Sequence, residues 1–247
     1  MIQVNPNMQH TVLEIGGERQ PVFIADNVLA EPDAFVDMAV GLPFTRSASS
    51  FYPGVQTPTP REYMDLVRDR LAPLIVQAYG IPAALSILES QLSLVTVRPE
   101  GLQVLQRVPH IDSTSLDRVA ILHYMCGPDM GGTSFFRHRR SGFEVITQQR
   151  AHEYSKLSKQ DADEFGEPAI RYHGDDTAAF EMTAHIEARF NRLVAYRGAI
   201  LHSGRIPDHF EYSANPRKGR LTINTFADIQ KKSPEDFAYG GALSFMR

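Results

Sequence analysis

The sequence predicts a mainly β protein with flanking helices, an α+β fold. Two segments near the start have apolar residues at helical spacing, whereas from about residue 85 the chain breaks into short runs of β-branched and aromatic residues. Turn-forming residues bound these runs, and a polar, partly helix-compatible stretch interrupts them between about 137 and 190. We therefore expect N-terminal helices beside a β core that carries one long insertion.

The first predicted helix covers about residues 31–40, with Pro32 in its first turn and Gly41 after its end. The second covers about residues 60–78 and stops at Gly80. Pro73 lies inside the second helix, so we expect a kink there.

The β-like runs predict the strands of the core. They are SLVTV (93–97), VLQRV (104–108), RVAILHYM (118–125), TSFF (133–136), NRLVAY (191–196), AILH (199–202) and RLTINTF (220–226). The chain shows no internal repeat and no linker-like shift in composition, which favours a single domain. We expect N-terminal helical support over 1–84, a core over 85–228 with the insertion at about 137–190, and a C-terminal tail over 229–247.

Composition excludes several classes of protein. Among 247 residues, 43% are hydrophobic, and 25 Lys and Arg against 29 Asp and Glu give a net charge of −4, which argues against a nucleic-acid partner. Cys126 is the single cysteine, so an internal disulfide or a cysteine-based zinc site is impossible. The start has no signal-peptide pattern and no apolar run reaches the roughly 18 residues of a membrane span, so we expect a cytoplasmic protein without a membrane partner. The oligomeric state stays open.

Histidine and acidic residues recur two positions apart in a way that composition alone does not decide. Nine histidines and 29 acidic residues predict about one His-x-Asp/Glu triplet by chance, and the chain has four, beginning at His110, His173, His185 and His209. A jelly-roll metal site needs such a pair before one strand and a second histidine on a distant strand that returns beside it. His110 and Asp112 meet this condition, because His202 ends a β-like run 90 residues after Asp112.

Two imidazoles and one carboxylate on one side of a metal form a facial triad that leaves coordination positions open. Residues i and i+2 of an extended segment point to the same side, so His110 and Asp112 can reach one ion. The alternative is a strand end with an ordinary surface histidine and aspartate.

Four segments in order resemble the Fe(II)- and 2-oxoglutarate-dependent oxygenases, particularly their prolyl-hydroxylase-like branch. They are PHID (109–112), ILHYMCGPDMGGTSFF (121–136), RLVAYRGAILHSG (192–204) and KGRLTINTF (218–226). The resemblance runs from about Leu92 to Asp228 and implies a double-stranded β-helix, or jelly-roll, core. It also implies that His110, Asp112 and His202 are the catalytic metal ligands.

The resemblance places the cosubstrate's distal carboxylate on a basic residue after the distal histidine. We assign this role to Arg220, helped by Thr222 on the same strand face and by Tyr124. The gap from His202 to Arg220 is longer than the family's usual hairpin, so Arg205 and Arg217 stay open as alternatives.

The implied activity is that of a hydroxylase-type dioxygenase with Fe(II) and 2-oxoglutarate as cofactors. Asp112 favours hydroxylation over halogenation, because halogenating members of the family have a small residue at this position. The substrate, a small molecule or a peptidyl group, is not indicated, and the insertion is expected to act as a lid or a substrate-binding element. A cupin-like lyase or isomerase and a non-catalytic jelly-roll binding protein are the alternatives.

Overall fold

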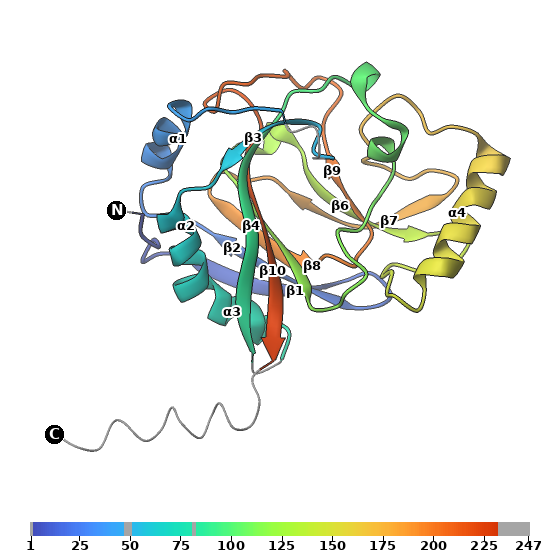
Figure 1. Ribbon diagram of the computed structural model, residues 1–247, viewed down its shortest axis with the longest axis horizontal. Helices are drawn as coiled ribbons and strands as arrows, with labels where there is room; N and C mark the ends of the chain where they lie inside the picture. The colour runs from blue at the N-terminus through green and yellow to red at the C-terminus, as the bar shows by residue number, and fades with distance from the viewer. Residues whose placement is uncertain (1, 47–50, 81–82, 232–247) are drawn as a thin grey trace, which may run out of the picture.

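Two antiparallel β-sheets pack face to face in the computed structural model, which describes residues 2–46, 51–80 and 83–231. The larger sheet has the strand order β1-β2-β8-β5-β10-β4-β3, and the smaller sheet has the order β7-β6-β9 (Figure 1). The strands are β1 Gln9–Ile15, β2 Gln20–Asp26, β3 Gly54–Pro58, β4 Ala83–Val95, β5 Arg118–Tyr124, β6 Gly132–His138, β7 Phe180–Glu187, β8 Arg192–Arg197, β9 His202–Arg205 and β10 Leu221–Lys231. The predicted mainly β, jelly-roll fold with flanking helices is confirmed.

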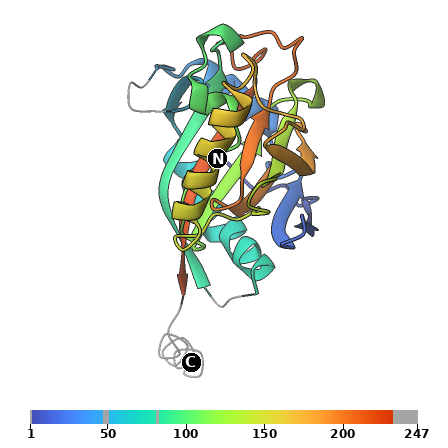
Figure 2. The same ribbon diagram turned by 90° about the vertical axis from the view of Figure 1, so that its right-hand side faces the viewer.

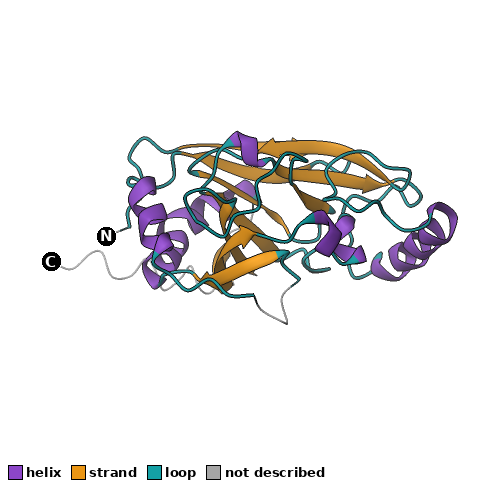
Figure 3. Cartoon of the chain, turned by 90° about the horizontal axis from the view of Figure 1, so that it is seen from above, coloured by secondary structure: helices purple, strands orange, loops and turns teal. Residues whose placement is uncertain are grey.

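Three helices near the N-terminus cover the outer face of the larger sheet. They are α1 Pro32–Val40, α2 Arg61–Leu66 and α3 Ala72–Ala78, and Figure 3 shows them gathered at one end of the molecule. A π-helical turn, Val67–Leu71, joins α2 to α3 just before Pro73. Because proline lacks a backbone N–H, the expected irregularity takes the form of this widened turn. No helix in the described ranges is both long and apolar enough to cross a bilayer.

Alternation along the central strands separates two cores. On β5, Val119 and Ile121 pack with the helices, whereas Ala120 and Tyr124 face the smaller sheet. Strand β10 pairs with β5 in register, Thr222 opposite Tyr124 and Phe226 opposite Ala120. Because successive side chains point to opposite faces, the inner face of the larger sheet is fixed by this register.

Several sequence-based boundaries need correction. The expected N-terminal helical support, 1–84, also contributes β1, β2 and β3 to the larger sheet. The run 104–108 is not a strand: Val104–Arg107 forms a 3-10 helix, closed by a capping box between Gln103 and Gln106. The run 199–202 becomes a strand only at His202. Of the expected C-terminal tail, β10 includes residues 229–231, and residues 232–247 lie outside the described part of the chain.

The insertion is shorter than its predicted limits of 137–190, because its ends belong to β6 and β7 of the smaller sheet. Between them lies helix α4, Ala151–Phe165, which stands at the edge of the molecule beside β7 in Figure 1 and in the foreground of Figure 2. The end of β6 holds this helix through Asp161: His138 Nε2 lies 2.5 Å from its Oδ2, and Arg140 Nε donates to its Oδ1 at 2.5 Å. Arg140 also pairs with Glu164.

A buried polar network joins the helices to the sheet at His123. Asn191 Oδ1 lies 3.2 Å from His123 Nε2, and because an amide oxygen only accepts, Nε2 carries the proton. Nδ1 then accepts from the Tyr63 hydroxyl at 2.9 Å. Burial lowers the pKa of His123 to about 4, while the bond to Asn191 opposes that shift. His123 is therefore a neutral structural residue.

This network makes stability depend on pH in a defined direction. Between its ordinary pKa of 6.5 and about 4, His123 is protonated in the unfolded chain but neutral in the folded protein, so stability falls as the pH drops through this window. His123 should lower the unfolding free energy of the wild-type protein by about 2 kcal/mol between pH 7 and pH 5. We expect the His123→Gln variant to lack this part of the decrease. Urea unfolding at both pH values measures it. His152→Gln, at an exposed position on α4, should keep the wild-type slope, and an unchanged slope in His123→Gln would contradict the assignment.

Candidate metal centre

The backbones of His110 and His202 hold the candidate centre together. His110 N–H donates to His202 O and His202 N–H donates to His110 O, each at 2.9 Å, which forms an antiparallel bridge. Asp112 N–H donates to Gly198 O at 2.8 Å, so residues 110–112 run extended beside 198–202. His110 and Asp112 therefore project to one side, as their spacing predicts.

The three side chains converge on one point. One donor atom from each of His110, Asp112 and His202 lies within 4.8 Å of the other two. His202 Nε2 is 3.6 Å from Asp112 Oδ2, and His110 Nε2 is 3.9 Å from Asp112 Oδ1. These separations are too long for hydrogen bonds, and the buried Asp112 Oδ2 has no hydrogen-bond partner in the described residues. A cation between the three atoms would satisfy that oxygen, so the residues fit a bound metal.

Protonation favours metal binding as well. His202 Nδ1 donates to Ile200 O at 2.8 Å, which leaves the Nε2 lone pair for a ligand. Burial lowers the pKa of His202 to about 4, and burial together with the neighbouring His202 does the same for His110. Burial raises the pKa of Asp112 to about 6, against the opposing charges of His110 and Arg118. At neutral pH the site therefore offers two neutral imidazoles and one carboxylate.

Gly198 permits the close approach of the two segments. A Cβ atom at this position would lie 3.2 Å from Asp112 Cβ and 3.0 Å from Arg118 Cγ. Both contacts are tighter than packed side chains normally show. No pattern in the sequence singled out this glycine, because the requirement comes from a partner 86 positions away in the chain.

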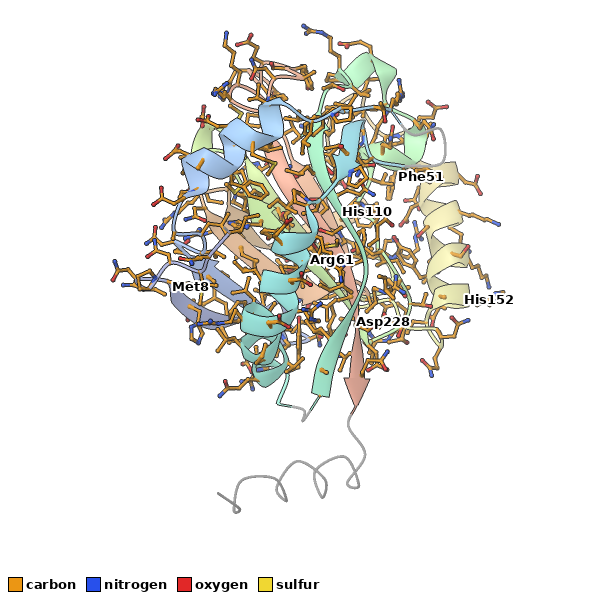
Figure 4. The ribbon with its side chains drawn as sticks, turned by 60° about the vertical axis from the view of Figure 1, so that its left-hand side comes forward. Met8, Phe51, Arg61, His110, His152 and Asp228 are labelled. Carbon is orange, nitrogen blue, oxygen red and sulfur yellow. The ribbon has the colours of Figure 1, made fainter. Side chains whose placement is uncertain are left out.

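A cavity of about 1410 Å³ opens on the three residues. The side chain of His110 is about half exposed to this space although protein surrounds it, and Figure 4 shows His110 toward the middle of the molecule. The walls include the inner face of the larger sheet, the 3-10 helix Val104–Arg107 and helix α4. The insertion thus borders the space in front of the triad.

Arg220 lies in the cavity wall, whereas the two alternatives do not. It is 4% exposed, and it donates from Nε to Met130 O at 3.1 Å and from Nη2 to Gly132 O at 3.0 Å. No carboxylate pairs with it in the described residues, although a buried charge normally has a partner. By contrast, Arg205 pairs with Asp175 and Arg217 with Asp37, all with substantial exposure.

The other two predicted cofactor-binding residues lie behind the cavity wall. Thr222 is fully buried, and Tyr124 is also buried, with its hydroxyl 2.6 Å from Thr133 Oγ1 and its ring 5.5 Å from Arg220 Cζ. Thr133 lines the cavity in this region. The structure thus brings Tyr124 against Arg220 but commits its hydroxyl elsewhere.

Tyr52 joins this group and was not among the predicted binding residues. It lines the cavity, and burial raises its pKa to about 12, while the charge of Arg220 and the nearby Thr222 hydroxyl oppose the shift. It belongs to the segment before β3, outside the predicted core. Only the tertiary fold brings its phenol to Arg220.

A family model described as "Family of unknown function (DUF6445)" matches residues 6–227. The chain belongs to this family. No curated protein sequence matches this chain.

Two solved structures are similar to this chain at low sequence identity. HygX from Streptomyces hygroscopicus, with nickel, 2-oxoglutarate and hygromycin B bound, has a TM-score of 0.45 and 11% identity over 90% of this chain and 82% of that one. An oxidoreductase of the 2OG-Fe(II) oxygenase family from Burkholderia pseudomallei has a TM-score of 0.35 and 12% identity over 87% and 72%.

The convergence of the three side chains predicts their effect on metal binding. His202→Ala removes one donor and should weaken anaerobic Fe(II) binding by on the order of 100-fold, since even supporting contacts around a metal contribute 10- to 100-fold. Calorimetry with Fe(II) measures this, and circular dichroism checks the fold. His209→Ala, at an exposed histidine of another His-x-Glu triplet, should bind iron as the wild type does. Equal affinity in both variants would contradict the site.

Proposed function

We propose that this protein is an Fe(II)- and 2-oxoglutarate-dependent dioxygenase that hydroxylates its substrate and releases succinate and CO2. The observation that carries the proposal is the convergence of His110, Asp112 and His202 on a cavity whose wall also holds the buried Arg220. Two imidazoles and a carboxylate with open positions are the donor set typical of non-haem iron oxygenases.

His110, Asp112 and His202 would hold the ion where the cavity borders them. When bound, Fe(II) with 2-oxoglutarate and dioxygen supplies the oxidising chemistry that hydroxylates the substrate. His202 keeps its orientation through Ile200 O, and the Asp112 carboxylate offsets one of the ion's two charges. Asp112 also occupies the position that a halide would need, which favours hydroxylation.

Arg220 is the proposed anchor for the distal carboxylate of 2-oxoglutarate. The carbonyl oxygens of Met130 and Gly132 accept hydrogen bonds from its guanidinium and hold it in place. Because these oxygens are uncharged, the positive charge of Arg220 is not neutralised. A planar guanidinium binds a carboxylate in a two-point geometry that an ammonium cannot reproduce. Tyr52, which lines the cavity beside it, adds a hydroxyl to the same pocket, and the fully buried Thr222 lies behind this wall.

The remaining cavity is the proposed place for the substrate, a small molecule or a peptidyl group. Helix α4 contributes Tyr154, Ser158 and Phe165 to the wall, so the insertion serves as a substrate-binding element. Its attachment through Asp161 holds that wall in place.

An anaerobic titration of metal-free protein with Fe(II) and then 2-oxoglutarate tests the proposal. We expect a weak visible charge-transfer band that requires both additions, and succinate after oxygen is admitted. Metal binding without any response to 2-oxoglutarate would favour a cupin-like lyase or isomerase. Absence of metal binding would favour a non-catalytic binding protein.

Arg220→Gln removes the charge that the distal carboxylate needs. We expect the dissociation constant for 2-oxoglutarate to rise at least about tenfold, since losing a buried charge-assisted pair costs roughly 2–5 kcal/mol, while Fe(II) affinity stays unchanged. The band titration measures both. Arg217→Gln, which breaks only an exposed ion pair with Asp37, is the matched control. A loss of affinity in Arg217→Gln or Arg205→Gln, with Arg220→Gln unaffected, would move the anchor to that residue.

A further inference from the structure

Tyr196 is a buried phenol at the metal end of the cavity. It lies on β8, is 4% exposed, and faces the smaller sheet. Its ring meets the His202 ring edge-on at a centroid distance of 4.8 Å and the Phe135 ring at 5.1 Å. These two contacts fix the ring, and therefore the hydroxyl, relative to a proposed metal ligand.

The hydroxyl of Tyr196 has no hydrogen-bond partner among residues 2–46, 51–80 and 83–231, although the residue lines the cavity. The fully buried side-chain atoms that lack a partner do not include this hydroxyl, which is open to the cavity. The hydroxyl of Tyr124, by contrast, is paired with Thr133. The free donor of Tyr196 is therefore available to a molecule in the cavity.

Two charges of opposite sign act on this hydroxyl. Burial raises the pKa of Tyr196 well above its ordinary value; the Asp112 carboxylate adds to the shift and Arg220 opposes it. The phenol is thus neutral and able to donate at neutral pH. The ring contact with His202 places the phenol beside the triad.

The strand register locates Tyr196 along the cavity. Tyr196 is opposite Ala120 on β5, whereas Thr222, beside the anchor, is opposite Tyr124. Four residues of strand separate these two rows by about 13 Å. Ala120 lines the cavity as well. Tyr196 therefore serves the triad end of a ligand that extends toward Arg220.

We propose that the Tyr196 hydroxyl donates a hydrogen bond to the oxo-acid end of 2-oxoglutarate, the end that faces the metal. The inference rests on the proposed function and extends it, because it assigns a binding residue to each end of the cosubstrate. Tyr196 binds the oxo-acid group, and Arg220 binds the distal carboxylate.

Two ligands separate these roles in the anaerobic, Fe(II)-loaded protein. Pyruvate keeps the oxo-acid group of 2-oxoglutarate but lacks its distal carboxylate. Tyr196→Phe removes only the hydroxyl and should weaken both ligands by a similar factor of about 10, the size expected for a hydrogen bond to a charged group. Arg220→Gln should weaken 2-oxoglutarate alone. Titrations followed by the charge-transfer band give the affinities for 2-oxoglutarate and for pyruvate. The Fe(II) affinity of Tyr196→Phe should equal that of the wild type.

Matched tyrosine variants complete the test. Tyr79→Phe removes a buried hydroxyl that packs on the helix side of the larger sheet, so it should change neither affinity. Unchanged affinities in Tyr196→Phe would overturn the inference, and so would weaker pyruvate binding in Tyr124→Phe alone. Loss of 2-oxoglutarate affinity without loss of pyruvate affinity in Tyr196→Phe would also overturn it. If wild-type protein binds neither iron nor 2-oxoglutarate, the proposed function fails first, which is a distinguishable result.

Discussion

The reciprocal backbone bridge between His110 and His202 is the constraint on which the candidate centre depends. Its two hydrogen bonds bring together residues that are 92 positions apart in the sequence. Once the bridge sets the register, the extended backbone directs His110 and Asp112 to the same side, and Gly198 lets the two segments approach. The jelly roll provides the rigid sheets that hold this bridge, so the geometry of three side chains follows from the pairing of two short segments.

Charge is distributed along the cavity in a way that suits a dicarboxylate on a divalent cation. One end offers a carboxylate and two neutral imidazoles, which together attract a cation. The other end offers a buried guanidinium that is held by carbonyl oxygens and has no carboxylate partner in the described residues. Leaving an arginine in this state costs free energy unless an anion completes it. The fold therefore supports a site that is electrostatically incomplete without its ligands.

The sequence predicted the parts of the structure that follow from local periodicity. The β-like runs that form β5 and β10, the helical spacing of α1, the helix-compatible stretch that forms α4, and the spacing of His110 and Asp112 all appear as expected. Contacts between distant segments could not be read in this way. Tyr52 meets Arg220 only because β3 joins the edge of the larger sheet, and the value of Gly198 depends on Asp112. The 3-10 helix Val104–Arg107 has the composition of a strand, but its own capping box decides its conformation.

The attachment of α4 has a consequence for how this protein can diversify. The helix belongs to a chain segment that leaves β6 and returns as β7, and its contact with β6 is concentrated on Asp161. The proposed metal ligands and Arg220 all come from other segments. Residues 144–146 hydrogen-bond to residues 199–201 beside His202, whereas α4 contributes to the wall of the cavity. Under the proposed function, substitutions on the cavity side of α4 can therefore change which molecules bind without altering the residues proposed to hold the iron.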